Sequence, residues 1–214
     1  MLLIITIILI FLFVLNFLLY WIIFLKTEKK ITRWWDIYTN IYFIIHISTI
    51  ILIPILSSSF WTTFFNIKSY FQGLWLLFLF LGIILVIIAI KFGRLTLIKI
   101  NNMKGLAKGK FPLITDGPYK IMRHPLNTSW AILFLGLAMI FDSTIALIIT
   151  PFLILHLELE GIMEEKFLLL PQFGEKYEKY KLETPSRLFP TPYNALLIII
   201  AIFIVYVGVL NLFL

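Results

Sequence analysis

Cysteine is absent from the 214-residue sequence. Its absence excludes disulfides, thiolate metal sites and cysteine nucleophiles. Histidine is scarce, and His46, His124 and His156 lie far apart with no HExxH or similar ligand spacing. The sequence therefore predicts no metal site.

Charged residues are missing over long stretches of the chain. Apolar residues make up 61% of the sequence and the mean hydropathy is +1.02, far above the values of a soluble domain. We therefore expect an integral membrane protein with the lipid bilayer as its main partner. The net charge of +7 reports orientation in the membrane and does not indicate a nucleic-acid partner.

The uncharged runs predict an all-α, polytopic membrane bundle of about five to six transmembrane helices in a single domain, 1–214. The first run has 25 residues, enough to cross a hydrocarbon core of ~30 Å. Full spans are expected at residues 1–25, 37–61, 70–90 and 195–214.

Two shorter apolar runs, 126–141 and 144–157, have 16 and 14 residues and flank Asp142-Ser143. At ~1.5 Å per residue they reach only about 21–24 Å, so they predict a helical hairpin. Its second arm continues into an amphipathic, mixed-charge segment over 158–191.

The basic residues predict the orientation of the spans. If the N-terminus lies outside and the chain crosses six times, all but one of the 18 Lys and Arg residues fall inside; Lys68 is the exception. The positive-inside rule then places the basic loop 91–125 and the segment 158–191 on the cytoplasmic face. The Ile- and Lys-rich composition favours a prokaryotic cell membrane.

A polar stretch, residues 116–125, directly precedes the first arm of the hairpin. Asp116-Gly117-Pro118 predicts a turn with Asp116 as N-cap of a short helix, on which Tyr119 and Arg123 share a face. Pro125 disfavours the α region for His124 and is well placed to begin the next helix.

Acidic residues gather on the extension of the second arm. His156, Glu160 and Glu164 fall at i, i+4 and i+8 on one helix face, and Glu165 follows. Charges at the end of a membrane helix indicate a water-filled or ligand-filled pocket, or the interface.

Taken together these motifs resemble the isoprenylcysteine carboxyl methyltransferase and phospholipid methyltransferase superfamily. The resemblance covers about residues 90–190 and rests on Gly117-Pro118-Tyr119, Arg123-His124-Pro125, Glu164-Glu165, Phe173-Gly174 with Tyr177 and Tyr180, and Pro185 and Pro190. It implies a membrane-embedded methyltransferase that uses S-adenosylmethionine and takes a lipophilic methyl acceptor from the bilayer. The acceptor would be the carboxylate of a prenylcysteine-like group or a phospholipid amine.

The resemblance also implies the site residues. Glu165 and Arg123 are the expected catalytic residues, and the expected cofactor contacts are Tyr119, Arg123, His124, Pro125, Asn127, Glu164 and Glu165. The chain departs from the family pattern at Asn127 and Ser129, where a tyrosine and a glycine are usual, and at Glu183, where an arginine is common. The spacing from the Glu-Glu pair to Phe173-Gly174 is one residue long around Pro171.

The chemistry of these side chains suits the cofactor. Arg123 can pair bidentately with its carboxylate, His124 can add a donor, and Glu164 or Glu165 can accept from the ammonium or the ribose diol. Tyr119 and Trp130 offer aromatic faces to the sulfonium or adenine. One glutamate could also take the proton of an amine acceptor.

Other interpretations of the same residues stay open. Arg123 could anchor the chain to anionic headgroups, the Glu-Glu pair could be a solvated face, and Tyr177 and Tyr180 could belong to an interfacial aromatic belt. Two rival functions also remain: an NADPH-dependent enzyme similar to sterol reductases, which have a similar Arg-His-Pro corner, and a non-catalytic lipid-binding membrane protein.

Overall fold

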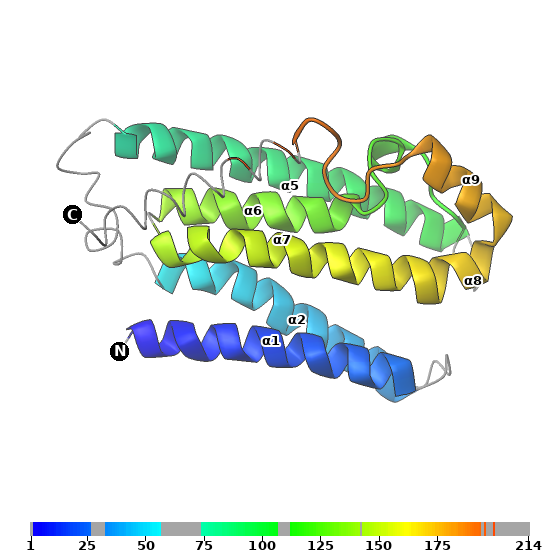
Figure 1. Ribbon diagram of the computed structural model, residues 1–214, viewed down its shortest axis with the longest axis horizontal. Coiled ribbons are helices and arrows are strands. Elements are labelled where there is room, and N and C mark those ends of the chain that lie inside the picture. Colours follow the sequence, from blue (N-terminus) through cyan, green and yellow to red (C-terminus); the bar gives the residue numbers. More distant parts are fainter. Residues whose placement is uncertain are drawn as a thin grey trace.

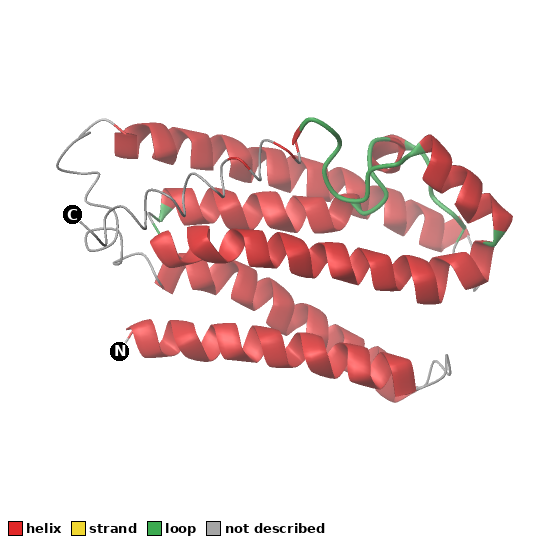
Figure 2. Cartoon of the chain, in the orientation of Figure 1, coloured by secondary structure: helices red, strands yellow, loops and turns green. Residues whose placement is uncertain are grey.

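A computed structural model describes residues 2–26, 33–56, 74–106, 112–141 and 143–193, with 195 and 199. These residues form helices joined by turns and loops, and no strand occurs among them (Figure 2). The all-α prediction is therefore confirmed. The first two helices, α1 (Leu2–Lys26) and α2 (Arg33–Leu56), pack side by side (Figure 1). They correspond to the expected spans at 1–25 and 37–61, but α2 begins four residues earlier, and residues 57–61 lie outside the described residues.

Helix α5 (Leu74–Leu106) is longer than the sequence suggested. We expected a span ending at residue 90 followed by a basic loop, but Lys91 and the residues up to Leu106 continue the same helix. The basic residues in this stretch are interspersed with apolar ones, and no proline interrupts it. A long basic side chain can extend from an apolar helix toward water, so positive charge alone did not mark the helix end.

Small residues bring α5 very close to α6 (Pro125–Ile140). A Cβ atom on Gly82 would lie 2.8 Å from the carbonyl oxygen of Gly136, and one on Gly136 would lie 2.9 Å from that of Gly82. Further along, a Cβ on Gly93 would meet Ser129 Oγ at 2.5 Å, and this hydroxyl donates to the Ala89 carbonyl at 2.9 Å. Close backbone approach through small residues is typical of helix packing in membranes.

The predicted hairpin consists of α6 and α7 (Thr144–Glu164), and the predicted break between its arms is confirmed. Ser143 caps α7, because its side chain accepts a hydrogen bond from Ala146 N at 3.1 Å. The hydrophobic core lies between this hairpin and α2, and Leu188 enters it from the C-terminal segment. Its fully buried members include Ile50, Phe134, Ala138, Ala146 and Leu157.

The second arm continues without a break into polar sequence, as predicted. It passes through a π-helical turn, η3 (Glu165–Leu169), into α8 (Leu170–Phe173), and after Gly174 the chain forms α9 (Glu175–Glu183). Gly174 has φ +52°, a left-handed conformation that favours glycine. The following segment, 184–193, returns along the loop that enters α6, next to α9 (Figure 1).

Two helical stretches are long and apolar enough to cross a membrane, Leu76–Asn101 and Ala146–Phe173. Shorter apolar stretches occur at Ile7–Leu19, Ile44–Leu56 and Pro125–Ile140. Many large apolar side chains of α1 and α5 are exposed, among them Phe11 at 63% and Phe80 at 61%. Such a surface suits lipid rather than water. The expected final span, 195–214, and the connector at 62–69 lie outside the described residues, apart from residues 195 and 199.

Candidate functional site

The polar stretch before α6 forms a turn, as predicted, but its helix is short. Gly117 has φ +63°, which favours glycine, and the one-turn 3-10 helix η2 (Gly117–Lys120) follows. Arg123 lies beyond this helix, so the prediction that Tyr119 and Arg123 share one face of it is wrong. Asp116 does not cap η2 with its side chain but pairs with Lys99 of α5. Because η2 is a single 3-10 turn that ends at Lys120, it does not reach the residue four positions after Tyr119.

The backbone around Arg123 and His124 is held by the C-terminal segment. Arg123 N donates to the Ser186 carbonyl at 3.0 Å, and His124 N donates to the Arg187 carbonyl at 2.9 Å. His124 has φ −122° and ψ 65°, outside the α region as expected before a proline, and Pro125 begins α6. These contacts therefore fix the direction in which the Arg123 and His124 side chains extend from this corner, residues 123–125.

The Arg123 guanidinium is buried and surrounded by acceptors. Its Nε donates to Glu165 Oε1 at 2.8 Å, and its Nη1 donates to the carbonyls of Thr184 and Pro185, both at 2.7 Å. Nη2 lies 3.5 Å from Glu165 Oε2. Arg123 thus ties η3 to the start of the C-terminal segment, and most of its donors are used within the protein.

His124 lies between the two adjacent glutamates. Its Nε2 is 3.2 Å from Glu165 Oε1, and its Nδ1 is 3.2 Å from Glu164 Oε2. Burial alone would lower the pKa of His124, but its hydrogen bonds with Glu164 and Glu165 raise it to about 9. The imidazole is therefore protonated at neutral pH and donates to both carboxylates.

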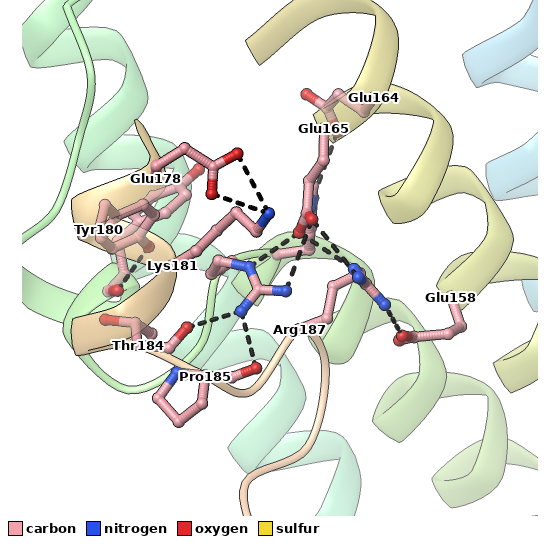
Figure 3. Close-up of polar contacts among 12 residues, drawn as sticks. Glu158, Glu164, Glu165, Glu178, Tyr180, Lys181, Thr184, Pro185 and Arg187 are labelled. Atoms are coloured by element: carbon pink, nitrogen blue, oxygen red, sulfur yellow. Dashed lines mark hydrogen bonds and ion pairs between the residues drawn. The ribbon is translucent and has the colours of Figure 1, made fainter. Parts of the chain in front are cut away.

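Arg187 completes the group and was not among the predicted site residues. Its Nε donates to Glu165 Oε1 at 3.0 Å, its Nη2 lies 3.4 Å from Oε2, and its Nη1 pairs with Glu158 (Figure 3). A Cβ on Gly161 would lie 2.8 Å from Arg187 Cδ, so the glycine gives this side chain room against α7. Its position four residues after Glu183, which replaces the family's usual arginine, was the signal available in the sequence.

We name Arg123, His124, Glu164, Glu165 and Arg187 the arginine–glutamate cluster. The Glu165 carboxylate accepts from two guanidinium groups and one imidazolium, and its side chain is only 6% exposed. The Glu164 side chain is 43% exposed. Because its second oxygen makes no contact within the cluster, Glu164 is the member best placed to accept a hydrogen bond from a ligand.

Two buried tyrosines of α9 lie against this cluster. The Tyr180 hydroxyl donates to the Tyr119 carbonyl at 2.6 Å. The Tyr177 hydroxyl is buried and makes no hydrogen bond of normal distance and angle, although it lies near the Glu165 carboxylate. Burial and the negative charge of Glu165 raise the pKa of Tyr177, so the hydroxyl stays protonated as a donor. Both side chains are buried here rather than exposed as a surface belt.

The remaining predicted site residues are more dispersed. Asn127 Nδ2 donates to the Leu157 carbonyl at 3.4 Å, and Pro125 is buried at the start of α6. Trp130 packs against the hydrophobic core. The structure thus brings Arg123, His124, Glu164 and Glu165 together, whereas Asn127 is directed to α7. The roles of all these residues toward a cofactor stay predictions.

Comparison with known proteins identifies one family. The family model described as phospholipid methyltransferase matches residues 76–176, which include α5 from its third residue, the corner, the hairpin and the Glu164-Glu165 pair. No curated protein and no solved structure matches the chain significantly. The family match supports a membrane methyltransferase in general and confirms the resemblance found in the sequence. The match over residues 76–176 is consistent with the isoprenylcysteine and phospholipid methyltransferase superfamily.

Proposed function

We propose that this protein transfers the methyl group of S-adenosylmethionine to a lipidic acceptor delivered from the bilayer. The observation that carries the proposal is the overlap between the family match, 76–176, and four members of the arginine–glutamate cluster. Glu165 and Arg123 remain our candidates for the residues that act at the reacting groups.

The side chains of the site fit the cofactor in two respects. The half-exposed Glu164 carboxylate offers an acceptor for an ammonium or a ribose hydroxyl, and the buried Tyr177 hydroxyl is a donor without a partner. Arg123 and Arg187 add positive charge that would attract the cofactor carboxylate, although Glu165 neutralises part of this charge. Tyr119, Pro125 and Asn127 would line the same corner.

The bound cofactor would supply a methyl group activated by a sulfonium, and the protein would supply alignment. The contacts from Arg123 and Arg187 to Glu165 hold η3 in a fixed position against the corner. Fixed geometry contributes most to an in-line displacement, in which charge disperses and little proton chemistry is needed. A phospholipid amine acceptor would in addition need a base, for which Glu164 is more accessible than Glu165.

Calorimetric titration of the purified chain with S-adenosylmethionine tests the cofactor. Loss of one charge-assisted hydrogen bond in Glu164→Gln is expected to weaken binding by about tenfold or more. The matched control is Glu178→Gln, whose carboxylate pairs with Lys181 at the surface and lies outside the site. Equal affinity of both variants would contradict the role of Glu164, and absence of binding to the wild type would contradict the proposal.

Membranes incubated with S-adenosylmethionine labelled in the methyl group test the acceptor. Label in the phospholipid fraction supports a phospholipid amine, and base-labile label in prenylated peptide supports a carboxylate. Binding without transfer would favour a non-catalytic lipid-binding protein. Fluorescence titration with NADPH provides the test of a reductase, for which saturable binding would be required.

We also propose that the chain is multi-pass, in a prokaryotic cell membrane, with the cluster on the cytoplasmic face. The distribution of Lys and Arg supports this orientation. Because the chain has no cysteine, single substitutions can be labelled selectively. An impermeant maleimide should label Lys68→Cys in intact cells and Lys120→Cys only after lysis; the reverse pattern would contradict the orientation.

A further inference from the structure

We propose that His46, His156 and Glu160 form a binding site for a divalent transition metal ion, with zinc as the expected ion. These three residues, named here the histidine cluster, come from α2 and α7 and do not belong to the arginine–glutamate cluster. The proposal goes beyond methyl transfer and does not depend on it.

The geometry of the three side chains suits one ion. One ligand atom from each residue can be chosen so that all lie within 4.8 Å of one another. Ligands of a tetrahedral zinc ion lie about 3.4 Å apart, because the bonds are about 2.1 Å long. Binding of the ion would draw the three ligand atoms together.

Two buried ring nitrogens in the cluster have no hydrogen-bond partner. His46 Nδ1 and His156 Nε2 are both unsatisfied, although the residues are only 3% and 8% exposed. A buried polar atom without a partner is costly, so its presence in a native structure calls for a water or an ion. Because one nitrogen of each ring also lies within 4.8 Å of a Glu160 oxygen, an ion would complete this cluster.

The surroundings orient the ligands. The two imidazole rings are stacked with centroids 5.5 Å apart, and Phe13 of α1 lies 5.2 Å from His46 and 4.7 Å from His156. The Tyr42 hydroxyl donates to Glu160 Oε1 at 3.1 Å. In metal sites, a carboxylate ligand typically also accepts a hydrogen bond from a residue that does not bind the metal.

The ligand types favour zinc, copper or nickel over magnesium or calcium. Two imidazoles and one carboxylate suit borderline transition metals, whereas magnesium and calcium prefer oxygen ligands. Three protein ligands also leave a fourth position for water or another ligand. The ion would join α2 to α7. The sequence predicted no metal site because His46 and His156 are 110 residues apart and only the fold brings them together.

A cobalt titration of the chelator-treated, tag-free full chain in detergent tests the site. We expect one equivalent of Co²⁺ to give the visible absorption of a four-coordinate ion and zinc to displace it. Zinc, but not magnesium, is expected to raise the melting temperature of the wild type. A polyhistidine tag must be removed, since it would bind either ion.

Variants locate the ion. Glu160→Gln and His156→Asn are each expected to weaken Co²⁺ binding at least tenfold, and Tyr42→Phe about tenfold. Glu178→Gln serves as the matched glutamate control and should leave binding unchanged. If His156→Asn does not fold, the test is the rise in melting temperature on adding zinc, which should be larger for the wild type than for Glu160→Gln.

Three results would overturn the proposal. These are no cobalt absorption in the wild type, absorption typical of a hydrated six-coordinate ion, or an equal thermal response of the wild type and Glu160→Gln to zinc. Any one of them would mean that the ion binds elsewhere or not at all.

Discussion

Two polar clusters of this protein each take residues from the continuous helix α7–η3 and differ in how their atoms are satisfied. In the arginine–glutamate cluster, the Glu165 carboxylate accepts from two arginines and His124. In the histidine cluster, two ring nitrogens, His46 Nδ1 of α2 and His156 Nε2 of α7, have no partner. Glu160 and Glu164 are only four residues apart on α7, so the two clusters are neighbours, although their other members come from different segments.

The difference indicates different roles. A cluster whose charges neutralise one another fixes the backbone segments that supply them, here the corner, η3 and the C-terminal segment. A cluster with unsatisfied atoms is completed by a ligand. The following experiments, in order of decreasing effect, would break or sharpen this distinction.

Glu165→Gln should have the largest effect on stability. It leaves Arg123, Arg187 and protonated His124 without their shared counter-charge in a buried place, and breaking a buried ion pair costs about 3–5 kcal/mol. Reversible unfolding in detergent measures the free energy. The exposed Glu178→Gln control should change it by less than about 1 kcal/mol. Similar values for the two variants would show that Glu165 is not the centre of the cluster.

The pH dependence of stability should report His124. Its pKa is raised from 6.5 to about 9, so its contribution is fully present below pH 6.5 and is lost as the pH rises through about 9. The loss between the two limits amounts to about 3 kcal/mol. Unfolding of the wild type and His124→Gln at a series of pH values tests this, because the loss should be absent from the variant. Parallel curves would contradict a protonated His124.

The two buried tyrosines of α9 provide a matched pair. Tyr180→Phe removes a hydrogen bond to the Tyr119 carbonyl and should cost about 1 kcal/mol, whereas Tyr177→Phe removes a hydroxyl without a partner and should cost nothing or stabilise slightly. If instead Tyr177→Phe costs as much as Tyr180→Phe, its hydroxyl has a partner in solution. Calorimetry with S-adenosylmethionine would then show whether ligand affinity also falls.

The smallest effect is expected in the histidine cluster without metal. His156→Leu removes an unsatisfied nitrogen and replaces the ring with an apolar side chain of similar size, so stability should change by less than about 1 kcal/mol. Unfolding of the chelator-treated protein measures this change. A loss as large as that of Glu165→Gln would mean that the two clusters do not differ as the contacts indicate.

Much of the fold follows from apolar run length. The runs predicted α1, α2 and the hairpin, and the Asp142-Ser143 break marked its turn because Ser143 is a good N-cap. The extent of α5 was not predictable from charge, because Lys91 and Lys99 can reach polar surroundings from within a helix. Lys99 in fact pairs with Asp116 of the next loop.

The site was predictable in part. The proximity of Arg123 and His124 to Glu164 and Glu165 was expected. A sequence does not show, however, that Glu165 would itself accept the hydrogen bonds of the Arg123 guanidinium. This pairing of donors and acceptors depends on how side chains 42 residues apart in the sequence pack together. The histidine cluster was missed because its residues carry no local spacing signal.

The π turn η3 has a consequence for how α7 and α9 relate. In a regular α-helix, one additional residue rotates everything after it by about 100°. Here the wider Leu170 N to Glu165 carbonyl bond accommodates the additional residue within a single turn, immediately before Pro171. The π turn therefore lets the chain hold one residue more at this point without rotating α9, and the Tyr180 hydroxyl still reaches the Tyr119 carbonyl.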